Sequence, residues 1–257
     1  MVLKTDAIVL RTMKYRDTSQ IATLYSRDLG RISVIAKGVR AKGARFGGVP
    51  DVMGQLSVVL YWHEHRDLHL LSRWEAKGRT SRITEEMERM AVGIGAVELI
   101  DAVSLHEEPR GAFYGLLADV LDAADRVPRN LPSLLPYFQL QVLAGLGFRP
   151  DFESCRKCGR DLTEGPLEGG EVVFEPERGS VACPACVSAP GESQKLSGGA
   201  LRTMQQLLRC SSPTAVADLA MLTTIRQEVS TALHTLLHAH VEGVRPLKSE
   251  AVFASLR

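Results

Sequence analysis

The sequence lacks a long apolar run. No stretch approaches the roughly 20 consecutive apolar residues that a membrane-spanning helix requires, so we expect no such helix. The first residues, MVLKTDAIVLR, carry charged side chains where a secretory signal would have its apolar centre. Both absences predict a cytoplasmic protein, and cytoplasmic proteins keep their thiols reduced.

Motifs of common enzyme classes are also missing. The sequence has no G-x-S-x-G nucleophile elbow and no G-x-G-x-x-G dinucleotide fingerprint. Residues 38–43 have the glycine spacing of a P-loop, but Ala44 and Arg45 stand where that loop requires Lys and Ser or Thr. Residues 63–67 begin with His-Glu, as an HExxH zinc-protease motif does, but Asp67 stands where the second histidine is required. We therefore predict that the protein is not an enzyme.

Net charge is nearly absent, yet it is unevenly distributed. The whole chain has a formal charge of +1. Residues 1–80 hold 14 Lys and Arg against 7 Asp and Glu, a balance of +7, whereas the remaining 177 residues hold 17 against 23, a balance of −6. Such asymmetry indicates an anionic partner for the N-terminal part. Nucleic acid is the first candidate, ahead of an acidic membrane surface or an acidic protein tail.

Cysteine is scarce, but four of the five cysteines form two CxxC pairs separated by residues 159–182. Each pair places two sulfur atoms on one tight turn. Two such turns supply four thiolates, which is the ligand set of a tetrahedral structural Zn²⁺. We predict that Zn²⁺ is bound by Cys155, Cys158, Cys183 and Cys186.

Two other chemistries suit the same cysteines. Cys183 and Cys186 alone resemble a redox pair, which would need a strand before it and a helix after it, but residues 187–193 are loop-like. Two disulfides are the other alternative, and a reducing compartment disfavours them. A zinc hydrolase would require an open coordination position, and four cysteines leave none.

Residues 1–80 have the pattern of a small β domain. Apolar and β-branched residues separated by turn signals predict five short strands. Their expected positions are 4–10, 21–25, 31–36, 55–62 and 68–74. Five strands without a helical crossover argue for a small antiparallel barrel, and the basic charge favours an OB-type barrel, whose open face accepts single strands.

A glycine-rich basic loop follows the third predicted strand. It has four cations in nine residues and no acidic neighbour: Lys37, Arg40, Lys42 and Arg45. A solvated charged face is the simpler alternative. If these side chains bind phosphates, binding will weaken steeply with salt. Phe46 and Trp62 are candidates for base stacking and equally for the core.

From residue 81 the apolar period becomes helical. We expect a helix capped by Thr84, with a core-facing stripe from Met87 to Ile100, and further helices at 113–124, 134–146, 200–208 and 215–241. Ser212 and Pro213 are expected to begin the last helix, and Gly243 to end it. The predicted class is α+β, with a barrel (1–80), a helical domain in two parts (81–150 and 191–257) and an inserted cysteine module (151–190).

Several isolated side chains have simple structural interpretations. His63, His65 and His69 are expected to be exposed polar residues, and Cys210 a small apolar filler. His234 and His238 form an i, i+4 pair that could chelate a metal, with His240 nearby. Because no third ligand is evident, we expect them on a surface or partly buried helix face.

Four segments resemble the RecO family of bacterial recombination mediators: RISVIAKGVR and RFGG within 31–48, LAGLGFRPDFESCRKCG (143–159), FEPERGSVACPAC (174–186) and VRPLKS (244–249). Their order and spacing span most of the chain. The family usually has Ser or Arg-Ser around positions 41–45, where this chain has AKGAR.

The resemblance implies an N-terminal OB barrel, a helical domain and a zinc module. It also implies binding of single- and double-stranded DNA, annealing of complementary strands, and loading of RecA together with RecR. It further implies contact with the acidic tail of the single-strand binding protein. The implied location is the bacterial cytoplasm, in association with the nucleoid. The candidate DNA contacts are Lys37, Arg40, Lys42 and Arg45, with Arg11, Lys14 and Arg31 as lesser contributors. The alternative is a zinc-stabilised adaptor whose basic barrel binds acidic protein tails.

Overall fold

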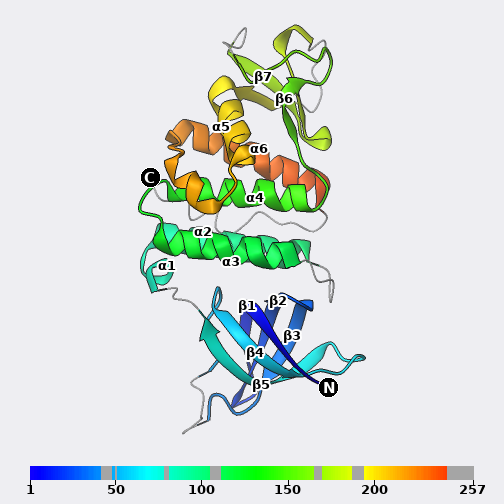
Figure 1. Cartoon of the computed structure of the whole chain (residues 1–257), viewed down its shortest axis with the longest axis vertical. Coiled ribbons are helices and arrows are strands. Elements are labelled where there is room, and N and C mark those ends of the chain that lie inside the picture. Colours follow the sequence, from blue (N-terminus) through cyan, green and yellow to red (C-terminus); the bar gives the residue numbers. More distant parts are fainter. Residues whose placement is uncertain are drawn as a thin grey trace. The chain divides into compact units, whose positions relative to one another are not determined.

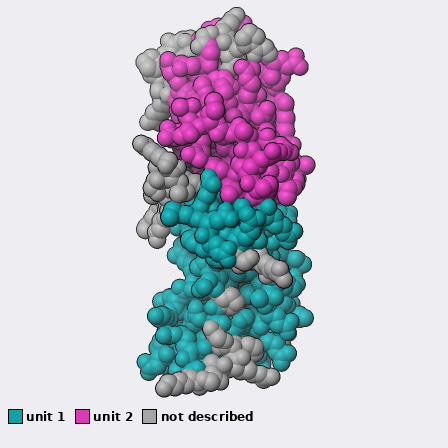
Figure 2. Space-filling model, turned by 90° about the vertical axis from the view of Figure 1, so that its left-hand side faces the viewer, with its two compact units in different colours: residues 1–126, 247–257 teal, residues 127–246 magenta. Residues whose placement is uncertain are grey.

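The computed structural model describes residues 1–41, 48–49, 51–77, 81–104, 111–164, 170–186 and 194–241 (Figure 1). These residues form two compact units that divide between Arg126 and Val127 (Figure 2). None of the helices in the described ranges is long and apolar enough to cross a membrane. The class is α+β, as predicted.

The first unit contains a closed five-stranded barrel. Its strands are β1 (Val2–Tyr15), β2 (Ser19–Ser26), β3 (Gly30–Ala36), β4 (Gln55–Tyr61) and β5 (Leu68–Lys77), in the order β1-β2-β3-β5-β4. Pairing of β1 with β4 closes the barrel, and only β3 and β5 run parallel among these pairs. A bulge between Val9 and Arg11 lets the long β1 bend from one neighbour to the other. The five predicted strands and the barrel are confirmed, but the barrel is not antiparallel throughout, because β3 and β5 run parallel.

The barrel interior follows from the period of two along each strand. Val9 of β1, Leu24 of β2 and Val34 of β3 point inward and are fully buried. The residues next to each of them along its strand point outward. Each such side chain contributes roughly 1.5–3 kcal/mol by leaving water. Trp62, which follows β4, is also part of this core at 8% exposure. Of its two predicted roles, the core position is therefore confirmed.

Three helices complete the first unit: α1 (Ser81–Glu85), α2 (Met87–Val103) and α3 (Gly111–Arg126). The prediction that Thr84 is an N-cap is wrong, because Thr84 lies inside α1. The carboxylate of Asp125 on α3 caps α1 instead, accepting from the backbone N–H groups of Arg82 at 2.9 Å and Ile83 at 3.1 Å. Met87 does not join the core-facing stripe, since 59% of it is exposed.

The second unit is built around the central helix α4 (Leu134–Gly145), preceded by the 3-10 turn η1 (Leu131–Ser133). A four-stranded sheet has the order β6-β8-β7-β9 and holds the cysteine region. Its strands are β6 (Asp151–Cys155), β7 (Glu171–Glu175), β8 (Ser180–Ala182) and β9 (Gln194–Ser197), with the 3-10 turns η2 (Pro176–Arg178) and η3 (Pro184–Cys186) beside β8.

The last segments of the second unit are α5 (Gly198–Arg209), the 3-10 helix η4 (Pro213–Asp218) and α6 (Thr223–His240). The single helix predicted for 215–241 is therefore wrong, because residues 219–222 separate η4 from α6. Ser212 does cap η4, as its hydroxyl accepts from the Ala215 N–H at 3.3 Å. Gly243 lies outside the described residues. The proposed domain boundaries stay a prediction, with α1 to α3 grouping with the barrel.

Candidate functional site

The four paired cysteines converge on one point. Their sulfur atoms all lie within 4.8 Å of one another, and the Sγ atoms of Cys158 and Cys183 are 3.8 Å apart. Tetrahedral zinc with Zn–S bonds of 2.3 Å requires sulfur separations of about 3.8 Å. The donor set and its spacing therefore fit a four-thiolate metal site.

Strand pairing brings the two turns together. Cys155 ends β6 and lies beside Val181 of β8, and Cys183 follows β8 by one residue. In the first turn, the Gly159 N–H donates to the Cys155 carbonyl at 2.8 Å, and Gly159 has φ +71°. In the second turn, the Cys186 N–H donates to the Cys183 carbonyl at 2.9 Å. Both turns thus present their sulfurs to the same side.

The surroundings of the cysteines favour the thiolate form of Cys155 and oppose that of Cys186. Burial acts to raise the pKa of Cys155, but backbone hydrogen bonds outweigh it and lower that pKa to about 6. One of these donors is the Cys183 N–H, 3.2 Å from the Cys155 sulfur. Hydrogen bonds to Cys158 and Cys183 raise the pKa of Cys186 to about 12. A cation among the sulfurs would favour the thiolate form, so metal binding at this site would be coupled to proton release.

None of the five cysteines forms a disulfide in the structure. The turn η3 that holds Cys186 has only three residues, and residues 187–193 lie outside the described ranges. Cys210 is separate from the cluster, at the C-terminal end of α5, where burial raises the pKa of its thiol.

The basic loop is anchored where it leaves the barrel. Lys37 and Arg40 are exposed, while Val39 between them is buried in the barrel core. Gly38 has φ +70°, a left-handed conformation that favours glycine, and the Arg40 N–H donates to the Thr18 carbonyl at 3.0 Å. Within the described ranges, neither Lys37 nor Arg40 has an ion-pair partner. Lys42, Arg45 and Phe46 lie outside those ranges.

The three lesser candidates have different surroundings. Lys14 is exposed opposite Gln20 on β2, and Gln20 in turn pairs with Ala36 just before the basic loop. Arg11 and Arg31 instead bind one carboxylate, that of Asp101 on α2, which Arg31 Nε reaches at 2.7 Å. The Asp101 side chain is only 2% exposed. These two arginines therefore join the barrel to α2, a role that the sequence did not indicate.

An apolar row crosses the outer surface of the barrel beside these cations. Strand register places four outward side chains next to one another across β1, β2, β3 and β5: Met13, Ile21, Ile35 and Leu70. Met13 is 59% exposed and the other three are half-buried. Tyr15 follows on the same face of β1, with the guanidinium of Arg16 5.3 Å from its ring centre. Sequence patterns alone did not indicate a role for Tyr15 on this surface.

His69 is not exposed, contrary to the prediction. It faces the barrel interior at 1% exposure and stacks on Trp62 with ring centres 3.8 Å apart. The reason is register, because His69 lies opposite the inward-facing Val34 of β3. His63 and His65 are exposed, as predicted.

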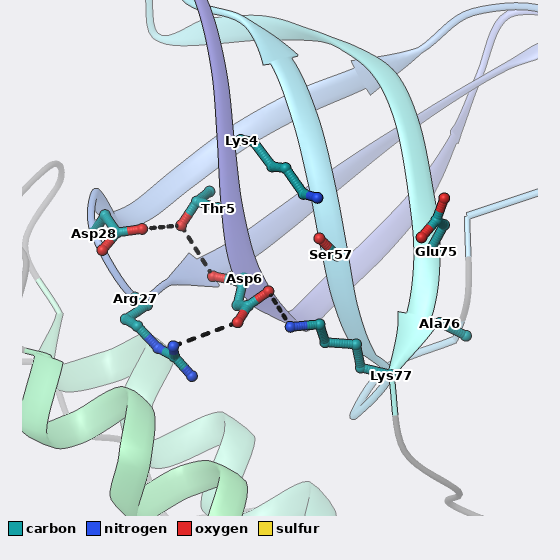
Figure 3. Close-up of a pocket in the computed structure, with 9 residues that line it drawn as sticks. All are labelled: Lys4, Thr5, Asp6, Arg27, Asp28, Ser57, Glu75, Ala76 and Lys77. Carbon is teal, nitrogen blue, oxygen red and sulfur yellow. Dashed lines mark hydrogen bonds and ion pairs between the residues drawn. The ribbon is translucent and has the colours of Figure 1, made fainter.

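A hollow of about 410 Å³ lies against the outer side of β1, β4 and β5 (Figure 3). Asp6 at its edge binds Lys77 at 2.6 Å and Arg27 at 3.4 Å. Asp28 accepts from the Thr5 hydroxyl at 2.6 Å. Three carboxylates share the hollow with three cations, so it offers no cationic track for a phosphate chain: Asp6, Asp28 and Glu75 with Lys4, Arg27 and Lys77.

Comparisons with known proteins agree along most of the chain. The family model "Recombination protein O N terminal" matches residues 1–79, and "Recombination protein O C terminal" matches residues 84–251. The chain is 31% identical over 253 residues to the DNA repair protein RecO of Symbiobacterium thermophilum, covering 98% of this chain and 96% of that protein. It is 29% identical over 255 residues to that of Salinibacter ruber, covering 99% and 94%. The chain belongs to the RecO family.

Proposed function

We propose that this protein is a DNA-binding mediator of recombinational DNA repair that works without covalent catalysis. In this proposal it binds single- and double-stranded DNA and anneals complementary strands. With RecR it loads RecA onto DNA that is coated by the single-strand binding protein, whose acidic tail it also contacts. Membership of the RecO family supports a role in recombination and repair, and thereby a cytoplasmic, nucleoid-associated location.

The observation that carries the DNA-binding proposal is the start of the basic loop. Lys37 and Arg40 are exposed, held by a fixed backbone, and without an ion-pair partner among the described residues. They follow β3, which ends at Ala36 and carries Ile35 of the apolar row. Phosphates would contact the cations while unstacked bases pack against Tyr15 and the row. Lys42 and Arg45 extend the same charge along the sequence, and Lys14 adds to it from β1.

Annealing needs no reacting group. Two strands repel each other through their phosphates, and a protein that neutralises both lowers this repulsion while leaving base edges free to pair. The net positive charge of residues 1–80 supports such a role for the barrel, whereas the negative balance of the remainder argues against DNA docking there.

The proposed metal at the cysteine centre is Zn²⁺ in a structural role. Cys155, Cys158, Cys183 and Cys186 would hold it, and four thiolates leave no open position for a substrate. The ion would join the turn after β6 to the turn after β8, and so fix the ends of two short strands. In this proposal the cysteine centre stabilises the second unit and does not contact DNA.

The test combines a quadruple variant with a salt titration. Replacing Lys37, Arg40, Lys42 and Arg45 by Ala should weaken DNA binding, slow strand annealing, and flatten the dependence of log K on log salt. The matched control replaces four exposed cations of the second unit by Ala: Arg129, Arg178, Lys195 and Arg209. A quadruple loop variant with the salt slope of the unchanged protein would contradict the proposal.

The adaptor alternative rests on the same surface, because cations beside an apolar row also suit an acidic peptide with apolar residues. Competition separates the two functions. A labelled oligonucleotide and an acidic peptide are offered together, and the mediator proposal expects the oligonucleotide to displace the peptide from the barrel. Displacement in the opposite direction at low salt would favour the adaptor.

A further inference from the structure

Two histidine side chains converge on the surface of α6. His234 and His238 lie one helical turn apart, and their Nε2 atoms are separated by 3.1 Å, with ring centres 4.3 Å apart. His238 is exposed and His234 is half-buried. Both nitrogens therefore point to one position that solvent can reach.

This separation matches the spacing that one metal ion imposes on two imidazoles. With metal–nitrogen bonds of 2.0–2.1 Å, adjacent nitrogens lie about 3.3 Å apart in a tetrahedral site. In a square-planar site the same bonds give about 2.9 Å. The observed 3.1 Å lies between the two values. The same two nitrogen atoms would bind a metal ion after small rotations of the rings, with no movement of the helix backbone.

The position along α6 also favours a cation. The helix ends at His240, so His238 lies in its last turn, where the exposed carbonyl groups carry partial negative charge, and His234 lies one turn before it. A positive ion there is stabilised by the helix itself. The histidine spacing and the helix terminus are independent observations that point to the same kind of ligand.

His240 is not part of this pair. Its Nε2 lies 3.0 Å from the Pro176 carbonyl oxygen, and its ring stacks on Phe148 with centres 4.7 Å apart. Over the described ranges, no third His, Cys, Asp or Glu completes the pair, because the only such cluster is that of the four cysteines. Water or an external ligand would fill the remaining positions.

We propose that His234 and His238 form a second metal site, which binds a divalent late transition metal ion such as Zn²⁺ through two imidazole nitrogens. The site is chemically distinct from the cysteine centre, since its donors are neutral nitrogens rather than thiolates. With two protein ligands it binds more weakly and exchanges its ion with solvent. This inference does not depend on DNA binding.

The experiment titrates the full chain, already carrying one equivalent of Zn²⁺, with further Zn²⁺ in a calorimeter or by equilibrium dialysis. We expect a second, weaker equivalent. His234→Gln or His238→Gln alone should lower its affinity by at least about tenfold, because chelation is lost, and the double variant should be little worse than either. His65→Gln removes an exposed histidine of the barrel and should leave the second equivalent unchanged.

Three outcomes would overturn the proposal. One is the absence of any second equivalent, and another is its persistence in the double variant. The third is a twofold loss in each single variant, which indicates two imidazoles acting independently. Should a variant fold poorly, nitrogen NMR of the unchanged protein decides the matter, since both Nε2 resonances must shift together as the second equivalent binds.

Discussion

The cysteine centre and the outer surface of the barrel show two ways of building a candidate site. The centre is closed, with four sulfur atoms within 4.8 Å that come from two short turns. The barrel surface is open, and its candidate contacts lie on separate strands that only register brings together. A closed site depends on every ligand, whereas an open surface divides its binding energy among many weak contacts. The two should therefore respond differently to single substitutions.

The largest effect is expected at the closed site. Cys155→Ser removes one thiolate and should cost the second unit several kcal/mol, because structural zinc contributes its binding free energy to folding. The measurements are thermal unfolding with zinc analysis, followed by DNA binding at low temperature. Cys210→Ser, outside the cluster, is the control and should change stability by less than about 1 kcal/mol. A stable Cys155→Ser protein that no longer binds DNA would show that the cysteine centre takes part in DNA binding.

The next effect concerns the join between barrel and helices. Asp101→Asn removes the buried carboxylate that binds both Arg31 and Arg11. Breaking such a buried pair costs about 3–5 kcal/mol, and urea unfolding of the first unit measures it. The side chain of Asp122 is 40% exposed. The control Asp122→Asn should therefore lower the free energy of unfolding by less than about 1 kcal/mol. Equal losses in both variants would show that Asp101 has no special role in joining α2 to the barrel.

A smaller effect is expected on the open surface. Tyr15→Ala should weaken single-stranded DNA binding by about 1–3 kcal/mol, the range for one base stacked on an aromatic ring. Fluorescence anisotropy measures it, with Tyr15→Phe as the control that keeps the ring. Duplex DNA should be less affected because its bases are already stacked. An equal loss on both DNA forms would remove Tyr15 from a stacking role.

The smallest expected changes in stability concern two glycines in different backbone conformations. Gly159 has φ +71° in the first cysteine turn, so Gly159→Ala should cost about 1 kcal/mol of stability. Gly115 lies within α3 with open space around it, so Gly115→Ala should stabilise by up to about 1 kcal/mol. Thermal unfolding of both variants gives the comparison. A neutral Gly159→Ala would mean that the turn tolerates a side chain in its left-handed conformation.

Local patterns predicted most of the fold. The alternation in residues 1–80 predicted all five strands, although β1 is twice as long as expected, and the CxxC spacing identified the four sulfurs that converge. Both signals arise from residues close in sequence. Contacts between distant residues were missed, among them the cap that Asp125 provides to α1 and the carboxylate of Asp101 between Arg11 and Arg31. Their partners lie dozens of residues away, and no local rule connects them.

The sequence alone determined the barrel, the basic segment after β3 and the four cysteines that converge, because strand period, charge density and cysteine spacing are local properties. Only the tertiary structure decided which cations are already neutralised, which face carries the apolar row, and that His69 is interior. Those outcomes depend on strand register and on the packing of α2 against β1. Register and packing are settled by the burial of many side chains together, so no single stretch of sequence reveals them.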